Sequence, residues 1–166
     1  MHVGRGVLIE RDSTIRCDDP NVVVRIGDGS VLAPYAFLST HKGSIEIGRR
    51  CSVNAYSVLY GLGGLKIGDH VRIAAHVVIV PANHIFDDPY APIAEQGSKK
   101  KGIVIEDDVW IGAGARILDG CVIGKGSVIG AGTVLTKSVG PYSVVVGVPG
   151  RVVGTRGAPR EARGNE

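Results

Sequence analysis

Large aliphatic residues recur at every sixth position along the second half of the chain. A second series follows four residues later, and its members are small or β-branched. No long segment shows the 3.6-residue spacing of an amphipathic helix. The pattern therefore predicts short strands, each of which sends one large and one small side chain into a shared interior. The large series is Ile105, Ile111, Ile117, Ile123, Ile129 and Leu135, and the small series is Val109, Ala115, Cys121, Ser127, Thr133 and Val139.

The same spacing organises the first half of the chain into groups of three hexapeptides. After each group the step lengthens from six residues to nine, eight and then twenty-six, so an insertion follows every third hexapeptide. Three short strands per turn predict an all-β triangular prism whose turns stack at the strand spacing of about 4.8 Å. All insertions should then leave from one corner. The groups are Ile26, Leu32 and Leu38; Ile47, Val53 and Leu59; and Ile67, Ile73 and Ile79.

Composition fits this architecture and narrows the function classes. Glycine accounts for 25 of 166 residues and aromatic residues for only 5%, which is typical of many tight turns between β-branched strands. The net charge of +3 is too small to indicate a nucleic-acid-binding or membrane-binding surface. No apolar run has the length of a membrane span, and the first residues do not resemble a secretory signal, so a cytoplasmic location is expected.

One domain is expected over residues 1–154. Residues 1–25 contain aliphatic side chains but do not keep the six-residue phase, so they are expected to form an irregular N-terminal cap over the open end of the prism. Residues 155–166 consist largely of Gly, Arg and Glu without an apolar anchor, and they are expected to form a disordered tail.

The longest insertion, residues 81–102, is the best candidate for a functional segment, because a long loop inside a tightly periodic solenoid is usually functional. It holds the adjacent pair Asn83 and His84. It also holds Phe86 and Tyr90, whose rings are expected to pack against a neighbouring subunit. Histidine titrates near neutral pH, so His84 can take a proton from a hydroxyl or an amine and release it later. A purely structural role for a single loop histidine is the alternative.

Four stretches of the C-terminal half carry a resemblance to a known family. They are residues 105–112 (IEDDVWIG), 111–120 (IGAGARILDG), 128–137 (VIGAGTVLTK) and 146–151 (VGVPGR). Together they resemble the hexapeptide-repeat acyltransferases, in particular the sugar O-acetyltransferase branch with its galactoside, maltose and bacterial polysaccharide acetyltransferases. The resemblance implies a left-handed parallel β-helix, acetyl-CoA as co-substrate, and a homotrimer with active sites at the subunit interfaces.

The same resemblance implies roles for individual residues. His84 matches a loop histidine that acts as general base. Asn54 matches an asparagine that contacts the acceptor, and Asn83, beside the histidine, is a second candidate for substrate binding. Basic residues are suited to the coenzyme phosphates, and small residues to a groove in which the backbone binds the pantetheine arm. The coenzyme groove is expected to be lined by Trp110, Ala113, Ala131, Thr136, Lys137 and Arg151.

A metal centre is not favoured. His70 and His76 are six residues apart, at equivalent places on adjoining sides of one turn, and His84 follows them. The same prism carries zinc in the γ-class carbonic anhydrases, but the spacing of this trio does not match the ligand spacing of that class. Cys51 and Cys121 fall on small inward positions and are interpreted as core residues. No metal is expected to be required.

The expected function is transfer of an acetyl group from acetyl-CoA to a hydroxyl of a sugar or sugar-containing acceptor such as a glycan. Neither nucleic acid nor a membrane is an expected partner. Two alternatives stay open: acetylation of an amine on an amino sugar or an antibiotic, and a non-catalytic solenoid that acts as a scaffold. The loop sequence does not distinguish a hydroxyl acceptor from an amine acceptor.

Overall fold

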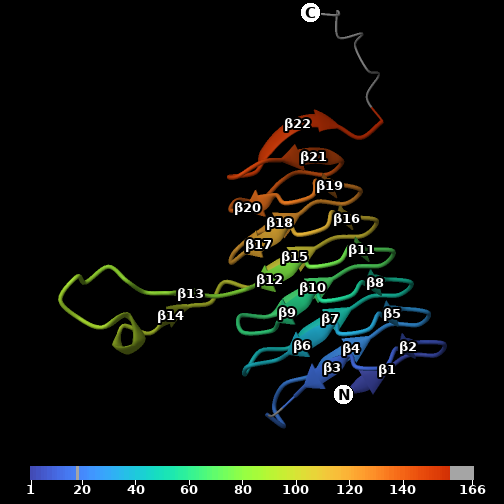
Figure 1. Ribbon diagram of the computed structural model, residues 1–166, viewed down its shortest axis with the longest axis horizontal. Coiled ribbons are helices and arrows are strands. Elements are labelled where there is room, and N and C mark those ends of the chain that lie inside the picture. The colour runs from blue at the N-terminus through green and yellow to red at the C-terminus, as the bar shows by residue number, and fades with distance from the viewer. Residues whose placement is uncertain (18, 158–166) are drawn as a thin grey trace, which may run out of the picture.

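The computed structural model describes residues 1–17 and 19–157. Its strands form three sheets that run along a single column, and one long loop extends from the side of that column (Figure 1). The chain passes from sheet A to sheet B to sheet C and then begins the next coil one strand further along each sheet. This arrangement is a left-handed parallel β-helix, and it confirms the all-β prism expected from the hexapeptide spacing.

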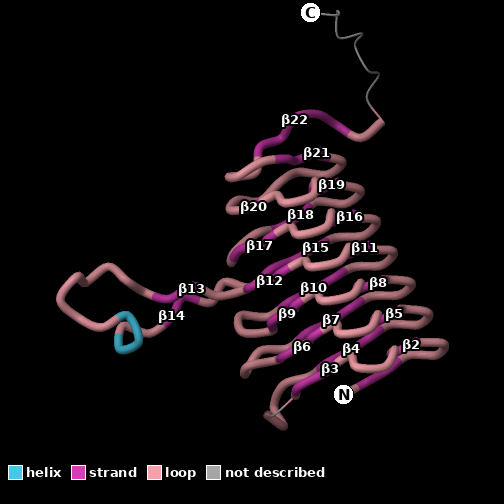
Figure 2. The backbone as a smooth tube through the Cα atoms, viewed as in Figure 1, coloured by secondary structure: helices cyan, strands magenta, loops and turns pink. Residues whose placement is uncertain are grey.

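Each of the first six coils contributes one short strand to each sheet (Figure 2), and two further strands extend sheet B. Sheet A contains β1 (His2–Val3), β4 (Val24–Ile26), β7 (Ile45–Ile47), β10 (Leu65–Ile67), β15 (Ile103–Ile105) and β18 (Val122–Ile123). Sheet B contains β2 (Leu8–Ile9), β5 (Val31–Leu32), β8 (Ser52–Val53), β11 (Arg72–Ile73), β16 (Trp110–Ile111), β19 (Val128–Ile129), β21 (Ser143–Val146) and β22 (Arg151–Thr155). Sheet C contains β3 (Thr14–Arg16), β6 (Phe37–Ser39), β9 (Val58–Tyr60), β12 (Val78–Val80), β17 (Arg116–Leu118) and β20 (Val134–Leu135).

The predicted aliphatic series fills the interior of the column. Ile67 on β10 lies in register with Ile47 below it and with Ile105 above it. Such ladders are almost inaccessible to solvent, and Ile117 in sheet C has an exposed fraction of 0%. Burial of apolar surface stabilises the fold by about 25 cal/mol per Å². Because each coil needs its neighbours to cover its aliphatic side chains, the stack rather than the single coil is the stable unit.

Residues 1–25 do not form the irregular cap expected from the sequence. Their strands β1, β2 and β3 pair in parallel with β4, β5 and β6 and complete an ordinary first coil. Val3, Ile9 and Ile15 keep the six-residue spacing and occupy the inward positions. The phase is hidden in the sequence by the eleven-residue step from Ile15 to Ile26. No strand of the described chain lies below this coil, so Val3 is 44% and Ile9 is 39% exposed.

Thr155 and Arg156, which were expected to belong to a disordered tail, have defined partners in the structure. Strand β22 runs antiparallel to β21 and extends through Thr155. The Arg156 N–H then donates to the Tyr142 carbonyl (2.7 Å), and its guanidinium contacts the Asp108 carboxylate (2.8 Å). Thr155 is therefore held by sheet pairing and Arg156 by an ion pair, and the composition indicates neither contact. Residues 158–166 of the expected tail lie outside the described residues.

All of the insertions leave from the corner between sheets C and A, as expected. We call this the CA corner; among the described residues it comprises 17, 19–23, 40–44, 61–64, 81–102, 119–121 and 136–138. The BC corner, between sheets B and C, consists instead of uniform four-residue turns. These turns are residues 10–13, 33–36, 54–57, 74–77, 112–115 and 130–133.

Candidate functional site

The long loop is a β-hairpin with an ordered tip. Its stem pairs β13 (Asn83–His84) with β14 (Ser98–Lys99), and its tip includes the 3-10 helix η1 (Ile93–Glu95). At the tip, the Gln96 side-chain amide donates to the carbonyls of Asp88 and Ala91, both at 2.8 Å. The loop extends away from the column (Figures 1 and 2). Tyr90 is 96% exposed, so the described chain leaves its ring uncovered.

His84 lies on the hairpin stem close to the CA corner, and it is exposed to solvent. It is held by its backbone: Asn83 pairs with Lys99 and His84 pairs with Ser98. The adjacent Ile85 N–H donates to the Gly97 carbonyl at 3.0 Å. The sheet pairing thus fixes the position of the His84 backbone, while the imidazole ring stays accessible to another molecule.

Ala113 and Ala131 lie one above the other on the BC corner. The Gly132 N–H donates to the Ala113 carbonyl (2.8 Å), which connects the two turns. Within the described chain, the N–H groups of Ala113 and Ala131 make no hydrogen bond, although the N–H groups of Gly112 and Gly132 do. Both alanines are exposed. This corner therefore offers free backbone donors that are not shielded by large side chains.

The other residues expected in the coenzyme groove lie at three different places. Trp110 projects from the outer face of sheet B with 55% exposure, in register with Arg72 and Val128 on the adjacent strands. Thr136 and Lys137 are exposed on the CA corner directly after β20. Arg151 begins β22 at the C-terminal end of the column, where its Nη1 donates to the Gly150 carbonyl at 3.0 Å.

Asn54 lies on the BC corner, two coils below Ala113. Its Nδ2 donates to the Ile73 carbonyl at 2.8 Å, and its N–H donates to the same oxygen at 3.0 Å. These bonds give the side chain a role in the turn and leave its Oδ1 without a partner among the described residues. Asn54 and His84 are at different corners, so a single chain does not bring them together.

An aromatic ladder on the BC corner was not predicted from the sequence. The rings of Tyr35 and Tyr56 stack with centroids 5.0 Å apart, and those of Tyr56 and His76 stack at 5.2 Å. All three residues have left-handed backbone, with φ of 62°, 60° and 59°. The sequence did contain a signal, because each ring comes three residues after the large aliphatic of a second hexapeptide. Gly114 occupies the same place in the next coil.

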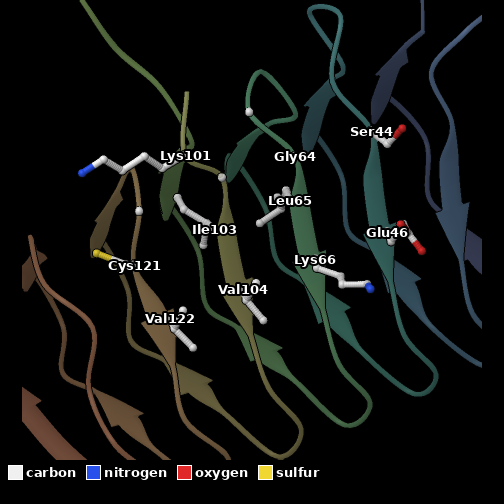
Figure 3. A pocket seen from close by; sticks show the side chains of 13 residues that line it. Ser44, Glu46, Gly64, Leu65, Lys66, Lys101, Ile103, Val104, Cys121 and Val122 are labelled. Carbon is white, nitrogen blue, oxygen red and sulfur yellow. The ribbon is translucent and has the colours of Figure 1, made fainter. Parts of the chain in front are cut away.

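The outer face of sheet A contains a shallow groove of about 370 Å³, shown in Figure 3. Its outward side chains come from adjacent strands and include Glu46, Lys66, Val104 and Val122. None of the site residues expected from the sequence lines this groove. It presents Glu46, two lysines (Lys66 and Lys101) and two outward valines without a histidine, so the candidate site lies on the loop and the BC corner.

Among residues 1–17 and 19–157, no three His, Cys, Asp or Glu side chains are grouped closely enough to hold a metal ion. Over the same residues, no helix combines the length and apolar character that crossing a membrane would require.

Comparison with known proteins identifies the family. The model for bacterial transferase hexapeptide (six repeats) matches residues 102–137. Galactoside O-acetyltransferase of Escherichia coli K12 is 32% identical over 144 residues, which cover 87% of this chain and 68% of that protein. The chain belongs to the hexapeptide-repeat transferase family.

Other members of the hexapeptide-repeat transferases extend the comparison. A probable acetyltransferase of Mycobacterium tuberculosis is 31% identical over 98% of this chain but 52% of its own length. The chain spans only between half and three-fifths of several curated relatives that it matches. A solved structure of a variant of AntD, an N-acyltransferase from Bacillus cereus, contains dTDP-4-amino-4,6-dideoxyglucose and coenzyme A. It has a TM-score of 0.82 at 29% identity and covers 93% of this chain and 83% of that chain.

Proposed function

We propose that this protein transfers an acetyl group from acetyl-CoA to a hydroxyl of a sugar or sugar-containing acceptor, with His84 as general base. One observation carries the proposal: an accessible imidazole is held on a hairpin stem in the coil directly before the free N–H of Ala113. The galactoside O-acetyltransferase relative and the coenzyme A in the AntD structure support the acceptor class and the donor.

The chemistry proceeds in a ternary complex. His84 accepts the proton of the acceptor hydroxyl while the hydroxyl oxygen attacks the thioester carbonyl. The carbonyl oxygen takes up negative charge, and the Ala113 N–H is free to donate to it. Collapse of this intermediate breaks the C–S bond and leaves the acetyl ester. His84 returns the proton to the thiolate, so the free imidazole and coenzyme A are regenerated.

The coenzyme is proposed to lie along the BC corner. Ala113 and Ala131 leave room for the pantetheine arm, and their unpaired N–H groups suit its amide carbonyls. Trp110 would form a wall near the thioester. Arg151, toward the C-terminal end of the column, would bind the phosphates. Lys137 and Thr136 lie on the CA corner and would reach the phosphates from the neighbouring copy.

The active site is proposed to form between copies of the chain. His84 leaves from the CA corner, whereas Asn54 and Ala113 lie on the BC corner, so a second copy must place its BC corner beside the loop. A threefold ring satisfies this requirement for every copy and closes on itself. Phe86, which is 68% exposed, and Tyr90 would be covered by the neighbour, and Asn83 and Asn54 would contact the acceptor.

His84→Ala tests the chemistry. Turnover is expected to fall by roughly 10²- to 10⁴-fold because the general base is removed, while calorimetry should still detect coenzyme A binding. His2→Ala is the matched control, because His2 is also an exposed histidine on a two-residue strand but lies in the first coil. Release of free thiol from acetyl-CoA measures turnover. A His84→Ala enzyme with normal turnover would contradict the proposed mechanism.

Mixing of variants tests the interface. His84→Ala and Ala131→Trp chains are each expected to be inactive, because one lacks the base and the other has a filled groove. In mixed trimers, an intact loop meets an intact BC corner at some interfaces, so activity should return. Light scattering should give about three times the 17.3 kDa chain mass. A monomer at micromolar concentration, or no recovery on mixing, would contradict the interface site.

Acetylation of an amine is the second candidate function, and the similarity to the N-acyltransferase AntD favours testing it. A screen should compare a galactoside, the matching amino sugar, a nucleotide-linked amino sugar and L-serine at equal concentrations. The proposal expects thiol release with a sugar hydroxyl. Thiol release with amines alone would replace it with N-acetylation. An absence of both transfer and coenzyme A binding would favour a scaffold.

A further inference from the structure

We infer that Ser98 is a positioning residue that orients the His84 imidazole through its hydroxyl group. The inference rests on the proposed function, because it gives Ser98 a part only through the general base. It begins from the register of the hairpin stem, in which His84 on β13 lies directly opposite Ser98 on β14.

The hydrogen-bond pattern of the stem decides how the two side chains are arranged. The Ile85 N–H donates to the Gly97 carbonyl at 3.0 Å, so the pair Ile85–Gly97 is hydrogen-bonded. Hydrogen-bonded and non-hydrogen-bonded pairs alternate along an antiparallel ladder, which makes His84–Ser98 a non-hydrogen-bonded pair. Opposite residues of this kind have Cα atoms about 4.5 Å apart and side chains on the same face. A serine hydroxyl at that separation can reach an imidazole nitrogen.

The side chains that could compete with Ser98 for the His84 ring lie on the other face of the stem or already have a partner. Lys99 pairs with Asn83, and strand alternation directs both away from the face that carries His84 and Ser98. The Lys99 ammonium forms an ion pair with the Asp87 carboxylate at 3.4 Å. That carboxylate, which could otherwise orient an imidazole, already has a partner. Neither the His84 ring nor the Ser98 hydroxyl makes a hydrogen bond within the described chain, and both residues are exposed, so the two groups are free to turn toward each other.

In the proposed arrangement, the Ser98 hydroxyl oxygen accepts the Nδ1–H of the neutral His84 imidazole. This bond selects the tautomer in which the Nε2 lone pair is free to take the acceptor proton. It can be kept when Nε2 becomes protonated, because Nδ1 remains a donor in the imidazolium. Serine therefore fixes the ring without adding a second negative charge beside the thioester.

Ser98→Val and Ser98→Thr form the decisive pair, because both are β-branched and of similar size, and only threonine keeps the hydroxyl. With Ser98→Thr, kcat is expected to stay near that of the natural chain. With Ser98→Val, it should fall roughly 10- to 100-fold, as the wrong tautomer becomes populated. The KM for acetyl-CoA should be unchanged in both. Equal kcat values for the two variants would overturn the inference.

Two further measurements separate this inference from the proposed function. In a His84→Ala background, Ser98→Val should cause no additional loss, because Ser98 acts only through the ring. Nitrogen-15 NMR should show the Nδ1–H tautomer of His84 in the natural chain and in Ser98→Thr, and its loss in Ser98→Val. An unchanged tautomer would overturn the role of Ser98 while leaving the base intact. Normal turnover in His84→Ala would instead remove the proposed function itself.

Discussion

Arg49 and Asp69 connect two successive coils through three hydrogen bonds. The Arg49 N–H donates to Asp69 Oδ1 at 2.7 Å, and its Nε and Nη2 donate to Oδ2 at 3.0 and 2.7 Å. These bonds hold the pKa of Asp69 below its ordinary value of 3.8, and the largest contribution comes from the hydrogen bonds of the Arg49 guanidinium. The carboxylate is therefore favoured in the folded state, and the contact connects two successive coils at the corner between sheets A and B.

Asp69→Asn should lower the free energy of unfolding at pH 7 by about 1 kcal/mol. The amide keeps an acceptor but loses the charge. Because the pKa of Asp69 is lower in the folded than in the unfolded state, its contribution is complete above pH 3.8 and is lost as the pH falls further. Urea unfolding should therefore show the difference from the natural chain at pH 7 and little difference in strong acid. Asp28→Asn, whose ion pair with Arg5 is longer at 3.8 Å and more exposed, should have the smaller effect.

Gly48→Ala should destabilise the column by about 1–3 kcal/mol or more through overpacking. A Cβ at this position would lie 2.5 Å from the Gly68 backbone, which cannot move without separating two coils. Gly140→Ala is the matched control, because its Cβ would meet no atom within 4 Å. Thermal unfolding followed by circular dichroism compares the two. Equal melting temperatures would contradict the close packing at Gly48.

Ile117→Ala should lower the free energy of unfolding by about 2–5 kcal/mol, because it leaves a cavity in the ladder. Ile117 is 0% exposed and lies between Ile79 and Leu135. Val104→Ala, on the outer face of sheet A with 38% exposure, should cost less than about 0.5 kcal/mol. Denaturant unfolding measures both changes, and similar losses would show that the interior is not the main source of stability.

Asp12→Asn should lower the pKa of Tyr35. The pKa of Tyr35 is raised above its ordinary 10.0, first by the charge of Asp12 and then by its hydrogen bond to that carboxylate. The neutral phenol is thus favoured in the folded state, so this contribution to stability is present below pH 10 and is lost as the pH rises beyond it. Ultraviolet titration of tyrosinate should show one group shifting to lower pH in Asp12→Asn. Tyr35→Phe identifies that group by its disappearance.

The hexapeptide spacing predicted the column well because the inward positions are repeated physical constraints. Ile105 and its equivalents had to be aliphatic, and every insertion had to leave from one corner. The regular first coil was not predicted from the sequence, because the step from Ile15 to Ile26 interrupts the six-residue spacing. Val3 and Ile9 do keep that spacing with Ile15. The anchoring of Arg156 depends on Asp108, a residue in another coil, and no local pattern indicates that pair.

The candidate site was predictable only in part. The position of His84 in the longest insertion and of Asn54 in a short turn already indicates that they leave different corners. The residue opposite His84, by contrast, depends on the register of a stem with two paired residues on each strand. That register is set by the loop tip between the strands, where Gln96 bonds to Asp88. Sequence spacing alone does not indicate which residue faces the imidazole.

The regularity of the first coil has a consequence for how such proteins can change. Since β1, β2 and β3 repeat the pairing of the coils that follow, the first described coil is an ordinary copy of the repeating unit. Gene segments encoding one whole coil could be duplicated or lost there without altering the surroundings of the hairpin. The height of the molecule and the chemistry at its side can therefore evolve as separate traits.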